Sequence, residues 1–150
     1  MKLHSGYSSR GERGNSMLEF AVGFALLFSL LSGVVQYGYS MYIYDLLESA
    51  VTSGAAYASR TTLDTRNTNF STAVKNMVVY GNAEGTGAAV VPGLTTSEVA
   101  VTQTPAAGFP DSITVNINSL NVNTVFRSFT FTGKPAVTMH FSGEYYTEGR

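Results

Sequence analysis

The chain has 150 residues, a formal net charge of −1 and no cysteine. This length accommodates at most one small domain beside a membrane segment. The lack of cysteine excludes disulfides, thiolate metal sites and thiol catalysis. No basic stripe or nucleic-acid-binding motif accompanies the near-neutral charge, so the sequence does not directly indicate a nucleic acid partner.

The first 14 residues predict a cytoplasmic leader peptide, with three Lys or Arg residues and one acid. Glu19 follows Gly14 by five positions, and no further charged residue occurs before Asp45. A carboxylate entering a membrane helix is costly, so Glu19 indicates a function and Gly14 a candidate cleavage point. The structural alternative is an acid that suits the helix dipole, or that reaches the membrane interface.

Residues 20–44 form an uncharged apolar run that predicts one transmembrane helix. A helix of about 20 residues crosses the hydrocarbon core, so the run is long enough. Tyrosines gather at its distal end and basic residues precede it, which places the N-terminus in the cytoplasm and the rest in the periplasm. A cleavable signal peptide is the alternative, but its apolar region spans only about 7–15 residues. The first Ala-x-Ala motif, at Ala56–Ala58, also lies far beyond the run.

Small side chains within the membrane run indicate a packing face. Ser29 and Gly33 are four residues apart, and such a small-xxx-small pair lets another helix approach closely. The alternative is that glycine is simply common in membrane helices, in which case this face has no particular partner. The pair is our predicted site of helix packing.

The helix is predicted to continue outside the bilayer, from about Ser16 to about Ser59. Apolar or small residues recur along one face at helical spacing, and polar residues occupy another. The apolar stripe comprises Leu47, Val51, Gly54, Ala55 and Ala58, and the polar face comprises Asp45, Glu48 and Thr52. An amphipathic half needs a partner surface, either its own domain or another subunit. The chain therefore divides into a leader (1–14), a transmembrane and extended helix (15–60) and an extracytoplasmic domain (61–150).

The extracytoplasmic domain is predicted to contain a short helix and an antiparallel sheet. Helical spacing runs over Asn69–Tyr80, with Gly81 as the C-terminal stop before a glycine-rich loop. Alternating apolar and polar residues predict strands over 98–104, 113–118 and 137–142. A further stretch, 121–132, is either a strand or an irregular apolar cover. A sheet layered on helices gives the α+β class, with a pilin-like N-terminal helix.

The sequence Gly14-Asn15-Ser16-Met17-Leu18-Glu19-Phe20 resembles the prepilin processing motif of type IVb pilins of tight-adherence (Tad) pili. In that family a glycine is followed by four variable residues, then Glu and Tyr or Phe. The longer minor pilins, or pseudopilins, of the TadE type are similar over 13–60. Two departures from that pattern are Gln36, where an acid is common, and the lack of a proline in the apolar run.

The resemblance implies a non-enzymatic minor pilin in the bacterial inner membrane. It implies cleavage by a prepilin peptidase between Gly14 and Asn15, which gives Asn15 a new α-amino group about one helical turn from Glu19. Glu19 and Phe20 would then take part in assembly with other pilins or pseudopilins through the N-terminal helix, in contact with membrane lipid. In the assembled pilus the chain would be extracellular and serve surface attachment and biofilm formation.

Other candidate sites in the sequence are weaker. His4 and His140 are isolated and do not make a metal site, and no catalytic signature or phosphate loop occurs. We expect no cofactor and no enzymatic activity. Two alternatives remain open: a permanently membrane-anchored envelope protein that binds a partner, and a secreted enzyme with an unusual signal.

Overall fold

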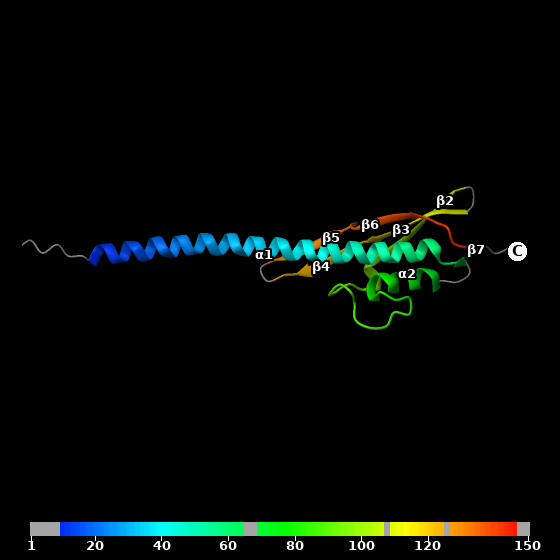
Figure 1. Ribbon diagram of the computed structural model, residues 1–150, viewed down its shortest axis with the longest axis horizontal. Helices are drawn as coiled ribbons and strands as arrows, with labels where there is room; N and C mark the ends of the chain where they lie inside the picture. Colours follow the sequence, from blue (N-terminus) through cyan, green and yellow to red (C-terminus); the bar gives the residue numbers. More distant parts are fainter. Residues whose placement is uncertain (1–9, 65–68, 107–108, 125–126, 147–150) are drawn as a thin grey trace, which may run out of the picture. The chain divides into compact units, whose positions relative to one another are not determined.

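A computed structural model describes residues 10–64, 69–106, 109–124 and 127–146 (Figure 1). The chain forms two compact units, of which the first ends at Gly38 and the second begins at Tyr39. In chain order the elements are α1 (Arg10–Arg60), β1 (Leu63–Asp64), α2 (Asn69–Tyr80), the 3-10 turn η1 (Thr96–Glu98), β2 (Val99–Ala106), β3 (Phe109–Ile117), β4 (Ser119–Asn123), β5 (Ser128–Thr132), β6 (Ala136–His140) and β7 (Tyr145–Tyr146). The predicted α+β class, with a long N-terminal helix and an antiparallel sheet, is confirmed.

Both predicted helices are present. α2 has the predicted bounds, and it stops where Gly81 adopts a left-handed conformation with φ 72° and donates its N–H to the Met77 carbonyl at 3.0 Å. α1 ends at Arg60, close to the predicted end, but begins at Arg10 rather than near Ser16. No proline lies between Arg10 and Ser16, so the local sequence does not break the helix there.

The three predicted strands form one antiparallel sheet in the order β2-β3-β6. Val101, Val115 and Val137 align across the three strands and face the core, while the alternate residues face outward. The ambiguous stretch 121–132 contributes to a separate hairpin, β4–β5, and its residues 125–126 lie outside the described part. A parallel pair, β1–β7, has no counterpart in the sequence prediction.

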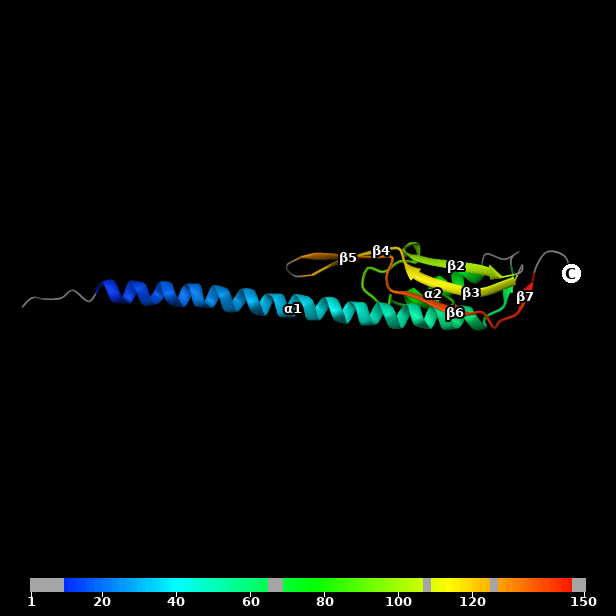
Figure 2. The same ribbon diagram turned by 90° about the horizontal axis from the view of Figure 1, so that it is seen from above.

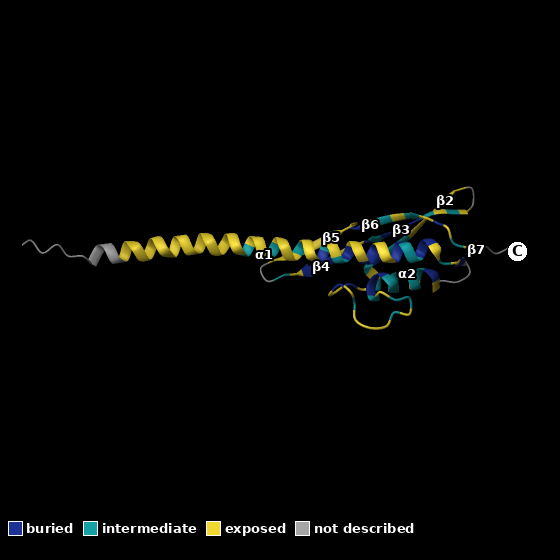
Figure 3. Ribbon diagram, viewed as in Figure 1, coloured by how far each residue is buried: buried dark blue, intermediate teal, exposed yellow. Residues whose placement is uncertain are grey.

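The core of unit 2 lies between α1, α2 and the inner face of the three-stranded sheet. The predicted apolar stripe of α1 is buried against this domain, so the amphipathic half of the helix finds its partner within its own chain. The two helices pack closely at Gly54, where an added Cβ would lie 2.3 Å from Val78 Cγ2. The predicted polar face, including Asp45 and Glu48, is exposed (Figure 3).

The C-terminal segment ties the end of α1 to the domain. The Ser142 N–H donates to the Ser59 carbonyl at 2.8 Å, and the Leu63 N–H donates to the Glu144 carbonyl at 2.7 Å. Gly143 fits here because a Cβ would lie 2.6 Å from the Thr61 carbonyl oxygen. Nearby, the Tyr146 hydroxyl donates to Glu144 Oε2 at 3.0 Å, and this hydrogen bond together with the negative carboxylate raises the pKa of Tyr146.

Candidate functional site: the exposed N-terminal helix

The part of α1 in unit 1 exposes large apolar side chains on every side. From Met17 to Val35, twelve of them are exposed: Met17, Leu18, Phe20, Val22, Phe24, Leu26, Leu27, Phe28, Leu30, Leu31, Val34 and Val35. Within the described residues, one helix is long and apolar enough to cross a membrane, with a mean hydropathy of 2.1 and none of that window buried. Figure 3 shows most of this segment as exposed. Apolar surface of this extent requires a lipid or protein environment.

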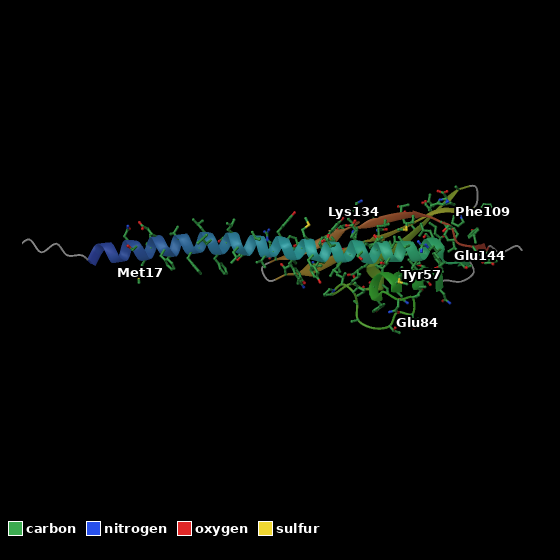
Figure 4. The ribbon with its side chains drawn as sticks, in the orientation of Figure 1. Met17, Tyr57, Glu84, Phe109, Lys134 and Glu144 are labelled. Carbon is green, nitrogen blue, oxygen red and sulfur yellow. The ribbon has the colours of Figure 1, made fainter. Side chains whose placement is uncertain are left out.

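The predicted processing residues lie together on this exposed helix, in the region of Met17 (Figure 4). Gly14 is exposed, and a Cβ added there would meet no atom within 4 Å. The Asn15 side chain donates from Nδ2 to Glu19 Oε1 at 3.2 Å, which is the contact that i, i+4 spacing permits. The prediction considered the Asn15 α-amino group beside Glu19 and missed this side-chain hydrogen bond.

Phe20, the second predicted assembly residue, begins a row of aromatic rings. Its ring centroid lies 6.2 Å from that of Phe24, with 24° between the ring planes. Phe24 in turn lies 6.1 Å from Phe28, at 19°. The sequence prediction did not single out this row, although phenylalanines spaced by four residues signal it directly. All three rings are exposed, so together they form one continuous aromatic strip.

Ser29 and Gly33, the predicted helix-packing pair, occupy a second exposed position on α1. The Ser29 hydroxyl donates to the Ala25 carbonyl at 2.7 Å, which satisfies this polar group within its own helix. A Cβ added to Gly33 would meet no atom within 4 Å. Close approach of another helix at this pair stays a prediction.

The weaker candidates in unit 2 do not gather into a site. The exposed His140 lies with Nδ1 3.6 Å from Asp111 Oδ1, a single contact between exposed groups. Within the described residues, His, Asp and Glu side chains form no group of three that could hold a metal ion. His4 lies outside the described residues.

An exposed apolar helix that continues into a small α+β domain suits a membrane-anchored, pilin-like protein. Residues 14–56 match the family model described as TadE-like protein, and this segment of the chain is TadE-like. The match confirms the resemblance found from the sequence. No curated protein and no solved structure matches the chain significantly.

Proposed function

We propose that this chain is a minor pilin of the Tad pilus system. A prepilin peptidase cleaves it after Gly14, the mature chain begins at Asn15, and the helix that follows anchors it in the inner membrane until assembly. In the pilus, the N-terminal helix packs against other pilins or pseudopilins, and the assembly serves surface attachment and biofilm formation. The observation that carries this proposal is the TadE-like match, which begins at Gly14 itself.

The local chemistry supports cleavage at Gly14. A peptide bond beside glycine is unhindered because the residue has no side chain, and the surroundings of Gly14 are open. Cleavage creates an α-amino group on Asn15 that carries positive charge near neutral pH. Glu19 lies one turn further along and already accepts a hydrogen bond from the Asn15 side chain. The charge pair that results offsets the cost of holding the carboxylate in an apolar assembly.

Incorporation into pili tests this proposal. The chain, expressed in a cell that builds Tad pili, is expected in the sheared pilus fraction. Glu19→Ala should still insert in the membrane, but its amount in the pili should fall roughly tenfold or more, because the α-amino group of Asn15, left unpaired in an apolar assembly, costs several kcal/mol. Glu84→Ala, which removes an exposed acid from the loop after α2, is the matched control and should assemble normally.

Two results would contradict the proposal. One is normal incorporation of the Glu19→Ala variant, which would show that assembly does not need the Glu19 carboxylate. The other is a wild-type chain that stays entirely in the inner membrane while pili form. That second result favours a permanently anchored envelope binding protein.

A further inference from the structure

The β4–β5 hairpin of unit 2 lies beside α1 and leads toward the point where that helix enters the unit (Figure 2). We call this point, at Tyr39, the proximal end of unit 2. The contact that fixes the hairpin there is between Tyr44 and Phe131, whose ring centroids are 6.0 Å apart. From Phe131 the strand runs back to Ser128, next to Arg127, and in Figures 1 and 2 β4 and β5 lie at the end of unit 2 where α1 enters it.

Simple geometry shows that the hairpin reaches the proximal end. Phe131 and Arg127 are four residues apart along the chain, which spans roughly 13 Å when extended. Tyr39 precedes Tyr44 by five helical residues, or roughly 7.5 Å along the helix axis. The strand is therefore long enough to bring Arg127 level with Tyr39 along the helix.

Arg127 is hydrogen-bonded through its backbone to Thr124, which follows β4. The Thr124 N–H donates to the Arg127 carbonyl at 2.9 Å, and the Arg127 N–H donates to Thr124 Oγ1 at 3.3 Å. The Arg127 side chain is exposed, and no ion pair to it occurs within the described part of the chain. The guanidinium is therefore available to a phosphate, which such a group binds with paired N–H donors.

The helix surface at the same end has the composition of a membrane interface. Tyr39, Met41 and Tyr42 are exposed there, and the two tyrosine rings lie 6.5 Å apart. Tyrosines concentrate at the headgroup level of bilayers because each ring has an apolar body and a polar tip. These residues directly follow the apolar, exposed part of α1.

The exposed acids of α1 are set back from this end. Asp45 and Glu48 come six and nine residues after Tyr39, which places them roughly 9 Å and 14 Å further along the helix axis. The Debye length at physiological salt is about 8 Å, so anionic headgroups at the proximal end would be largely screened from them. On the described part of α1, no acidic side chain therefore lies at the level of the proximal end, where Arg127 supplies a positive charge.

We propose that Tyr39, Met41, Tyr42 and Arg127 form a proximal surface on which unit 2 rests against the bilayer, with Arg127 binding the phosphate of a lipid headgroup. This surface is a second membrane contact, in addition to the spanning helix. It rests on the membrane-anchoring part of the proposed function and is independent of cleavage and pilus assembly.

Single-cysteine labelling tests this proposal on the full chain, which has no native cysteine. Ser128→Cys, beside Arg127, and Ala106→Cys, at the end of β2, both replace exposed residues and are labelled with a fluorophore. Each chain is reconstituted at one copy per nanodisc of phosphatidylcholine and phosphatidylglycerol that contains a headgroup nitroxide quencher. We expect strong quenching of the Ser128→Cys label and little quenching of the Ala106→Cys label.

A charge substitution tests the role of Arg127. Arg127→Gln should lower the ratio of docked to undocked domains about fivefold, the effect of removing one basic residue at an anionic surface. Lys134→Gln removes an exposed cation beyond the opposite end of β5, and this matched control should leave quenching unchanged. Hydrogen exchange of the β2-β3-β6 amides verifies that every variant is folded.

Three outcomes would overturn the proposal: equal quenching at both label positions, quenching that Arg127→Gln does not change, and quenching that appears only with several chains per nanodisc. The last would assign the proximal surface to a neighbouring subunit. A chain that fails to enter nanodiscs at all would instead refute membrane anchoring. Failure of cleavage after Gly14, measured separately by mass, would leave the proximal surface unaffected.

Discussion

The two halves of α1 are a natural comparison, because one helix meets two environments. In unit 1, Leu27 is 68% exposed and apolar residues surround the helix, whereas in unit 2 Leu47 is 0% exposed and apolar residues follow a single stripe. A helix that is apolar all round belongs in lipid, and an amphipathic one covers a folded domain. The change in pattern along α1 therefore marks where an exposed apolar surface gives way to a stripe buried by the domain.

The largest effect expected from this comparison follows removal of a core side chain. Leu47→Ala should lower the free energy of unfolding of unit 2 by about 2–5 kcal/mol, through lost burial and the cavity left behind. Leu27→Ala makes the same chemical change on the exposed half and should leave that free energy unchanged. Denaturant unfolding of the full chain in detergent, followed by the near-UV circular dichroism of its tyrosines, measures both. A similar loss in both variants would show that the halves do not differ in this way.

A smaller effect is expected where the two helices of unit 2 touch. Gly54→Ala places a methyl group against Val78 and should cost roughly 1–3 kcal/mol, as overpacking in a core does. Gly33→Ala, at an open position of the same helix, should leave unit 2 unaffected and favour helix formation by about 1 kcal/mol. The same unfolding measurement applies. A stabilising effect of Gly54→Ala would mean that α1 and α2 separate easily.

Much of the fold follows from local sequence. Asn69–Tyr80 was predicted with its observed bounds because helical spacing ends at a glycine that caps the helix. The apolar stripe that contains Leu47 and Val51 follows from helical spacing in the same way. The β4–β5 hairpin was not, because it depends on a contact across the chain between Tyr44 and Phe131. The β1–β7 pair is only two residues long and joins distant parts of the chain, so no local pattern signals it.

The candidate site was predictable to a similar degree. The spacing of Gly14, Asn15 and Glu19 is visible in the sequence, and the structure adds the hydrogen bond between Asn15 and Glu19. Arg127 carries no motif. Its position gains meaning only from the β4–β5 hairpin, whose Phe131 contacts Tyr44 of α1.

The central claim is that this chain is the substrate of a peptidase that cuts after Gly14, and intact-mass analysis of the chain from pilus-forming cells tests it most directly. We predict a mature chain that begins at Asn15, and a Gly14→Val variant that keeps its full-length mass. Gly23→Val, at another open glycine of α1, is the matched control and should be processed normally. A full-length wild-type chain, or normal processing of the Gly14→Val variant, would contradict the account.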